Sequence, residues 1–237
     1  MRRTLPDARR WMRHGTTLLL KETDLDDAAL NGPCALPGWT RRRLIAHVAA
    51  NAGALGNLVH WAATGEPTPM YASPRERAAG IENGAKLPAG ELAGWLGRSA
   101  DMLEEAMDRL TAEQWQVPVR TAQGRTVPAA EVPWLRSREV WIHAADLATG
   151  LSFADLPADF LAALCDDVIT RRGAQPGQAL ILTATDTDGS WGLPGNGTAA
   201  AVSLPGPLAD VAAYLTGRAH QLTTAYGAAA PDLAPWL

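Results

Sequence analysis

Cysteine is scarce in this sequence. Only Cys34 and Cys165 occur in the 237 residues, and they form no Cys-x-x-Cys pattern. Redox motifs and many structural zinc sites depend on such paired spacing. We therefore expect two reduced thiols with a structural role. If the chemistry of this protein needs a thiol, that thiol has to come from another molecule.

Long basic runs and long apolar runs are also lacking. The net charge is −4, so a nucleic-acid partner is not expected. No stretch is apolar and uncharged for long enough to cross a membrane. The first residues lead into a charged helical pattern, which does not resemble a secretory signal. We therefore expect a cytoplasmic protein whose partners are neither nucleic acids nor membranes.

The composition is that of a folded protein. Hydrophobic residues make up 47% of the chain and charged residues 19%, which supports a substantial core and argues against disorder. The length suits one large domain or two small ones. Tryptophan occurs nine times, against two Phe and three Tyr. So many indoles fit either a wide pocket wall or plain core filling.

Helical periodicity dominates the first part of the chain. Thr40 has the character of an N-cap, and Gly65 that of a helix end. A short hairpin or irregular loop is expected around Gly124, where Arg120 and Arg125 either bind a substrate carboxylate or are exposed turn residues. The pattern predicts helices at 5–30, 41–63, 74–83, 88–110 and 131–149.

The pattern changes after Gly150, where strands begin to alternate with helices. Helices are expected at 157–171 and 207–219, and strands at 178–185, up to Trp191, and at 199–204. Such mixing after an all-helical part predicts a second, smaller domain. We therefore predict an α+β protein, with a helical domain over 1–152 and a small α/β domain over 153–237.

Three polar side chains fall on the apolar stripes of two predicted helices. Glu139 and His143 are four residues apart, so one helix places them on the same face. His47 shares the apolar stripe of the helix at 41–63. Burying a carboxylate and two imidazoles without a partner is costly, and helical bundles often build metal sites from inward-facing side chains.

On spacing and burial alone, a metal site and a structural polar cluster explain this trio equally well. A Glu-x-x-x-His pair is usually a surface ion pair, and a lone buried histidine is usually hydrogen-bonded in the core. If a metal is bound, zinc suits two imidazoles, one carboxylate and an open position. Asn51 and Asp146 are candidates to hold an imidazole by its other nitrogen, or are plain core hydrogen bonds.

Longer motifs carry a more specific signal, because they resemble the mycothiol-dependent maleylpyruvate isomerase family over most of the chain. The matching segments are Leu44-Ile45-Ala46-His47-Val48-Ala49, Asn51-Ala52, His60-Trp61-Ala62, Thr64-Gly65-Glu66, Thr68-Pro69-Met70-Tyr71, Ser73-Pro74, Thr121-Ala122-Gln123-Gly124-Arg125-Thr126-Val127-Pro128-Ala129, Trp134, Arg136-Ser137-Arg138-Glu139-Val140-Trp141-Ile142-His143-Ala144 and Asp146-Leu147.

The resemblance implies a DinB-like four-helix bundle followed by a C-terminal α/β domain similar to sterol carrier proteins. It implies zinc, held by His47, Glu139 and His143, and mycothiol as the thiol cofactor. It also implies an arginine from the C-terminal domain near the site, and Tyr214-Leu215-Thr216-Gly217-Arg218 assigns that role to Arg218. The candidates for binding substrate carboxylates are then Arg218, Arg77 and Arg125, in that order.

The implied reaction converts maleylpyruvate to fumarylpyruvate, a step of the gentisate pathway of aromatic catabolism. A thiolate adds to the double bond, the adduct rotates about the resulting single bond, and the thiolate leaves. Zinc would lower the pKa of the thiol or polarise a substrate oxygen. Two rivals stay open: a mycothiol S-transferase acting on another electrophile, and a non-catalytic bundle that binds a thiol conjugate or a protein. We expect a monomer with a small-molecule substrate.

Overall fold

The chain forms two compact units, which a computed structural model describes over residues 3–173, 177–197 and 200–234. Thr4–Leu151 makes the helical unit, and the described residues from Ser152 onward belong to a smaller α/β unit. The α+β fold class predicted from the sequence is therefore confirmed. Within these ranges no helix has both the length and the apolar character of a membrane span.

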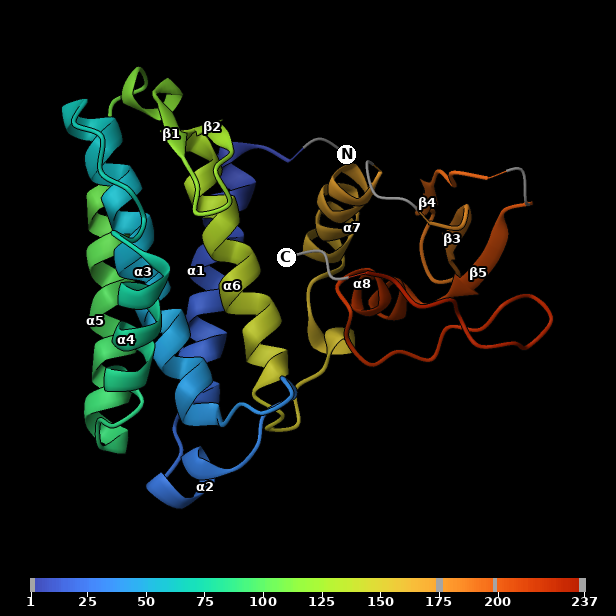
Figure 1. The fold of residues 1–237 in the computed structure, drawn as a ribbon, viewed down its shortest axis with the longest axis horizontal. Coiled ribbons are helices and arrows are strands. Elements are labelled where there is room, and N and C mark those ends of the chain that lie inside the picture. Colours follow the sequence, from blue (N-terminus) through green and yellow to red (C-terminus); the bar gives the residue numbers. More distant parts are fainter. Residues whose placement is uncertain (1–2, 174–176, 198–199, 235–237) are drawn as a thin grey trace. The chain divides into compact units, whose positions relative to one another are not determined.

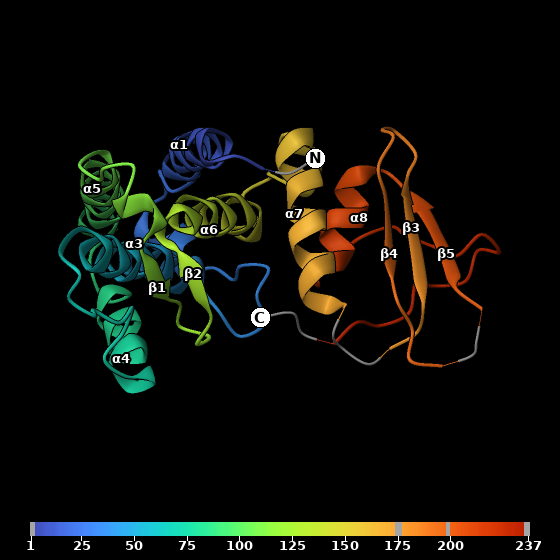
Figure 2. The ribbon, with the colours of Figure 1, turned by 90° about the horizontal axis from the view of Figure 1, so that it is seen from above.

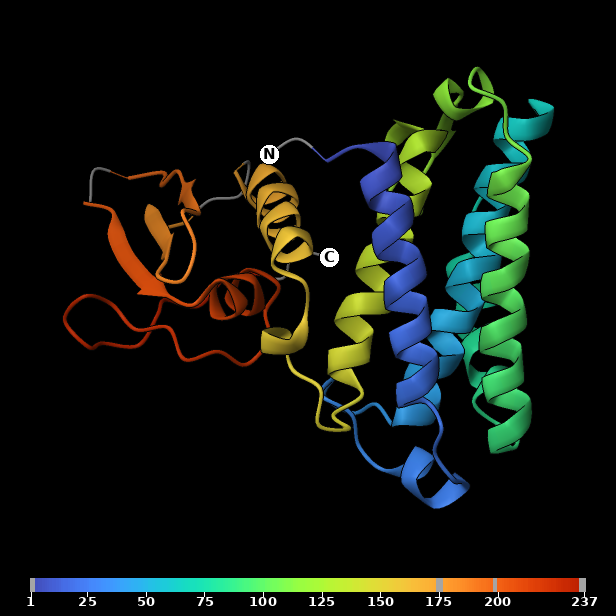
Figure 3. The same cartoon turned by 180° about the vertical axis from the view of Figure 1, so that it is seen from behind.

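Four long helices build the first unit (Figure 1): α1 (Leu5–Glu22), α3 (Arg41–Thr64), α5 (Ala89–Asp108) and α6 (Val132–Asp146). Helix α3 packs along α5 and also against α6. Figure 2 shows α4 (Pro74–Gly84) on the outside of α3. Figure 3 shows α1 running beside α6, with which it packs. This is the predicted four-helix bundle.

Side-chain caps account for where these helices begin. The Thr4 hydroxyl accepts from the backbone N–H of Asp7, and the Asp7 carboxylate accepts from the N–H of Thr4, which makes a capping box. The Thr40 hydroxyl accepts from the N–H of Arg43 at the start of α3. Gly65 ends α3 with φ at 79°, a conformation that favours glycine.

The single helix predicted at 5–30 is wrong, because the chain breaks it into two. Helix α1 ends at Glu22, where the Thr23 hydroxyl donates back to the Leu20 carbonyl. Helix α2 (Asp27–Asn31) then begins afresh, because the Asp26 carboxylate accepts from the N–H of Ala29. Thr and Asp compete for backbone hydrogen bonds in this way and so favour helix ends over helix interiors.

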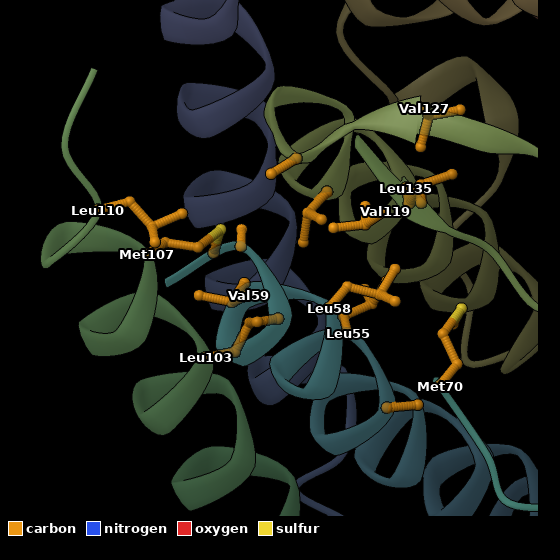
Figure 4. Close-up of a cluster of buried hydrophobic side chains, with 14 of the residues drawn as sticks. Leu55, Leu58, Val59, Met70, Leu103, Met107, Leu110, Val119, Val127 and Leu135 are labelled. Carbon is orange, nitrogen blue, oxygen red and sulfur yellow. The ribbon is translucent and has the colours of Figure 1, made fainter. Parts of the chain in front are cut away.

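One large apolar cluster fills the bundle at the end where the hairpin lies (Figure 4). The hairpin pairs β1 (Pro118–Arg120) antiparallel with β2 (Thr126–Pro128), between the 3₁₀ turns η1 (Gln114–Gln116) and η2 (Ala129–Glu131). Val119 and Val127 turn inward from the two strands toward Leu55 and Leu58 of α3. The hairpin predicted around Gly124 is therefore present, and its two inward-facing valines cover one end of the apolar core.

The C-terminal end of α6 is tied to the start of α3. The guanidinium of Arg41 donates from Nε to the Leu147 carbonyl at 2.7 Å and from Nη2 to the Ala148 carbonyl at 3.0 Å. These carbonyls lie at a helix end and have no partner within the helix. Helix α6 therefore stops at Asp146, before the predicted end at 149, and the described backbone turns at Ala148, where φ is 54°.

The second unit is a small sheet with helices on one face (Figure 2). Its strands β3 (Leu180–Ala184), β4 (Ser190–Leu193) and β5 (Val202–Gly206) lie in the order β4-β3-β5, antiparallel for β3–β4 and parallel for β3–β5. Helices α7 (Ala158–Arg172) and α8 (Leu208–Leu215) pack together, and the turn η3 (Phe153–Asp155) precedes them. The third strand begins later than predicted, and Ala199 lies outside the described residues.

Candidate metal centre

Helices α3 and α6 bring His47, Glu139 and His143 together, near the start of α3 and the C-terminal end of α6, which Arg41 joins. Nε2 of His47 lies 3.1 Å from Oε2 of Glu139, and Nε2 of His143 lies 3.5 Å from the same oxygen. The two imidazole rings meet nearly edge to face, with centroids 5.2 Å apart. One ligand atom from each side chain lies within 4.8 Å of the other two, and this trio could hold a metal ion.

The donors of this trio fit a zinc ion. Glu139 Oε2 is shielded from solvent yet makes no hydrogen bond of good geometry to a described residue. Two imidazole nitrogens nevertheless lie within 3.5 Å of it, as expected of three groups that share a cation. The Glu139 side chain keeps 21% of its surface exposed, so the trio is open to a further ligand on one side.

The outer nitrogens of the two imidazoles have different partners. Nδ1 of His143 lies 2.9 Å from Oδ2 of Asp146, whose side chain is buried. A carboxylate at this place orients the ring and leaves Nε2 for a metal, so Asp146 lies where the sequence interpretation expected it. Nδ1 of His47 instead lies 3.4 Å from Nη2 of Arg77, on α4.

Of the two alternatives given for Asn51, the structure shows the core hydrogen bond and not a contact with an imidazole. Its side-chain oxygen accepts from Nη1 of Arg136 at 3.1 Å. Asn51 lies one turn beyond His47 on α3, at the level of Arg136 on α6, and so faces the guanidinium. The sequence did not indicate Trp39 as a neighbour of the trio. The centroid of its ring lies 6.0 Å from that of His47, with the two rings nearly perpendicular, and the Arg43 guanidinium lies 4.6 Å from the centroid of the Trp39 ring.

Charge is shared unevenly within the trio. Burial alone would raise the pKa of Glu139, but contacts with His143 and His47 hold it well below its usual range. Burial alone would lower the pKa of His143, but the hydrogen bond to Asp146 and the nearby Glu139 carboxylate outweigh it and raise that pKa to about 9. At neutral pH the metal-free trio therefore contains an ionised carboxylate beside a protonated His143.

This arrangement predicts that zinc binding releases a proton. Since His143 has a pKa of about 9 without metal, its Nε2 has to lose a proton before it can bind zinc. Apparent zinc affinity should rise by up to about tenfold per unit between about pH 7 and pH 8.5, and titration calorimetry in buffers of different ionisation enthalpy should detect the proton. An affinity that stays constant over that range contradicts the assignment of His143.

Arg77 connects the trio with a groove of about 910 Å³. Helices α3, α4 and α5 and the loop at 68–72 line this groove, and Asn57 holds the loop by donating to the carbonyls of Pro69 and Met70. The Arg77 guanidinium lies on the groove wall, 5.7 Å from the centroid of the Tyr71 ring, and its Nη2 contacts His47. A ligand in the groove can therefore reach Arg77, whose side chain contacts His47.

The other two predicted arginines lie elsewhere. Arg125 is exposed at the hairpin turn, and within the described residues its side chain shares no hydrogen bond or ion pair with the trio. Arg218 belongs to the second unit, just after α8, where Gly217 has φ at 72° and Nη1 of Arg218 donates to the Thr216 carbonyl at 2.6 Å. That turn ends the helix before the predicted residue 219. The roles of both arginines stay predictions.

Comparisons with known proteins point in one direction. The family model described as the mycothiol maleylpyruvate isomerase N-terminal domain matches residues 3–148. A crystal structure of the mycothiol-dependent maleylpyruvate isomerase is 37% identical, has a TM-score of 0.90, and covers 98% of this chain and 97% of its own. A histidine-to-alanine mutant of that isomerase gives 36% identity with the same TM-score and coverage. None of the curated proteins matches this chain.

Proposed function

Because the chain belongs to the mycothiol-dependent maleylpyruvate isomerase family, we propose that it is a zinc- and mycothiol-dependent cis–trans isomerase that converts maleylpyruvate to fumarylpyruvate. The supporting observation is that this chain, which is similar to that isomerase over 98% of its length, brings two imidazoles and one carboxylate to within 4.8 Å of one another. The proposal includes a cytoplasmic monomer that acts in aromatic catabolism through the gentisate pathway.

Zinc would be held by His47, Glu139 and His143, with Asp146 orienting the His143 ring. A zinc ion at this place supplies a Lewis acid, which lowers the pKa of a thiol or polarises a substrate oxygen. The protein's own contribution is to hold both Nε2 atoms toward Glu139 and to limit solvent around them. The exposed part of the Glu139 side chain is where the reactants would approach the ion.

The isomerisation follows from the chemistry of a conjugated alkene. Mycothiol, when bound, would supply a thiolate that adds reversibly to one alkene carbon: the displaced electron pair would rest on the neighbouring carbonyl while the bond is single and free to rotate, and would re-form the trans double bond as the thiolate leaves. The protein has to bind both substrate carboxylates through this sequence, a task suited to arginine.

Arg77 is the substrate-binding candidate that the structure places against the trio, because its Nη2 lies 3.4 Å from Nδ1 of His47. Replacing Arg77 with methionine should raise KM for maleylpyruvate by about 10–100-fold, because a lost hydrogen bond to a charged group costs roughly 1.5–3 kcal/mol. Steady-state kinetics with saturating mycothiol measure this effect. Arg75 lies exposed on the same helix and offers the matched control. Equal changes in the R75M and R77M variants contradict a specific role for Arg77.

Arg218 and Arg125 complete the proposal as further carboxylate ligands. Arg218 follows a tight turn at the end of α8, and Arg125 is exposed on a hairpin. Arg218 is partly exposed as well, so solvent reaches both side chains. The family resemblance supports Arg218 more strongly than Arg125.

A second candidate is a mycothiol S-transferase that acts on a bulkier electrophile. The groove beside Arg77 favours it, because about 910 Å³ is ample for a drug-sized ligand and its lining includes Trp95, Met102 and Leu103. The same trio would serve either reaction, since function depends on the site and not on the fold.

One assay separates the two functions. The purified protein is incubated with zinc and mycothiol, and with either maleylpyruvate or a generic electrophile such as a chloro-dinitroaromatic compound. We expect catalytic formation of fumarylpyruvate that requires mycothiol, and slow conjugation of the electrophile. Fast conjugation without isomerisation would establish the S-transferase. If neither reaction is observed, the protein is a non-catalytic binding protein.

A further inference from the structure

A buried arginine lies next to the trio and has no assigned role. Arg136 exposes 1% of its surface, among the lowest values of any charged side chain described. It lies three residues before Glu139, and this spacing places both on one face of α6. Burial lowers the pKa of the Arg136 guanidinium to about 10, while nearby Glu139 and Tyr71 oppose that shift. The group therefore keeps its charge at neutral pH.

Among the described residues, the hydrogen bonds of Arg136 cross from α6 to α3 through one nitrogen, Nη1. Nη1 donates to the Val48 carbonyl at 2.6 Å and to the Asn51 side-chain oxygen at 3.1 Å. Val48 directly follows His47 in the chain. The guanidinium thus ties the backbone beside one imidazole of the trio to the helix turn that carries Glu139.

Folding stability alone does not explain a group of this kind. Nε and Nη2 of Arg136 are buried and have no acceptor among the described residues. Burying unpaired donors of a charged group is costly, and an apolar side chain of similar volume often serves a core as well or better. Nor can Arg136 touch a substrate directly, since almost none of its surface is accessible. Its benefit has to lie in what it holds in place.

We propose that Arg136 is a positioning residue for the metal centre, which sets the separation of His47 and Glu139 by fastening α3 to α6 about one helix turn away from them. This inference rests on the proposed zinc site, but it does not depend on which reaction the site catalyses. Outer groups that orient metal ligands typically change metal affinity by about 10–100-fold when removed. Arg136 acts on the ligands through the backbone of α3 instead of through an imidazole nitrogen.

Zinc affinity and cobalt spectra test the proposal without any turnover assay. The variants are R136M, which keeps bulk but no donor or charge; R136K, which keeps the charge on one nitrogen; and N51A, which removes one acceptor. The control is R172M, because Arg172 is also buried and donates to the backbone carbonyls of Leu215 and Ala234, in the second unit. Competition with a chromophoric chelator measures zinc affinity, and the visible spectrum of the Co²⁺-loaded protein reports coordination geometry.

We expect R136M to lower zinc affinity about 10–100-fold and to alter the cobalt spectrum, R136K to fall between it and the wild type, and N51A to have a smaller effect. R172M should leave both readouts unchanged even if it lowers the melting temperature. Wild-type zinc affinity and cobalt spectra in R136K and N51A overturn the proposal, whether or not R136M folds. Equal effects of R172M overturn it as well. A wild-type protein that binds zinc but isomerises nothing refutes the proposed function and leaves this inference standing.

Discussion

Replacing His47 with alanine is expected to abolish both zinc binding and isomerisation. His47 supplies one of the two imidazoles, and its Nε2 lies 3.1 Å from Glu139 Oε2. Since changes outside the ligand shell already cost about 10–100-fold in metal affinity, loss of a ligand should cost at least ~100-fold. A Lewis acid contributes several kcal/mol to such a reaction, so kcat/KM should fall by about 10³-fold or more. Metal analysis and the isomerase assay measure the two effects.

His60 offers a matched control for this experiment, because it lies exposed on the same helix, α3. The H60A variant should keep wild-type zinc content and activity. Full activity in zinc-free H47A protein would refute the assignment of the trio. Loss of activity with full zinc content would show that His47 acts in some way other than as a ligand.

Omitting mycothiol is expected to reduce isomerisation to the uncatalysed rate, a loss of at least about 10³-fold given ordinary enzymatic accelerations. The chain has no suitable thiol of its own. Cys165 is completely buried in α7, and Cys34 is partly buried. Burial raises the pKa of both thiols, so neither provides a thiolate at neutral pH. Neither belongs to the potential metal-ligand group identified among the described residues.

The C34A/C165A double variant completes this test. With zinc and mycothiol present, its activity per folded molecule should match that of the wild type, because the nucleophile comes from outside. Circular dichroism establishes the folded fraction, since a buried cysteine contributes to packing. Mycothiol-independent activity that disappears in C34A would instead identify an internal nucleophile, and the proposed reaction sequence would then be wrong.

The trio could be predicted from the sequence because helical periodicity determines which side chains share a face of a helix. Four-residue spacing placed Glu139 and His143 on one face, and the apolar stripe of α3 turned His47 inward. The meeting of the two helices is a tertiary event, and only the family resemblance anticipated it. Asp146 followed from the same spacing, since a residue three positions after His143 faces the same side.

Features set by distant side chains could not be predicted. Helix α6 stops at Asp146 because Arg41, from another helix, binds the carbonyls beyond it. Asn51 faces Arg136 and not an imidazole. This depends on how far α3 and α6 are shifted relative to each other along their axes. The sequence does not indicate that Arg136 is buried, because an arginine within a polar motif usually lies on the surface. Its position three residues before Glu139 was the one signal that could have revealed it.

The location of the metal is the central claim, and crystals of zinc-loaded protein test it most directly. Anomalous diffraction above and below the zinc absorption edge locates the ion independently of the protein density. The account predicts one strong peak bonded to Nε2 of His47, a carboxylate oxygen of Glu139 and Nε2 of His143, at about 2.0–2.2 Å. A peak bonded to other residues, or no peak while Glu139 keeps its contacts of 3.1 and 3.5 Å with the two imidazoles, would contradict it.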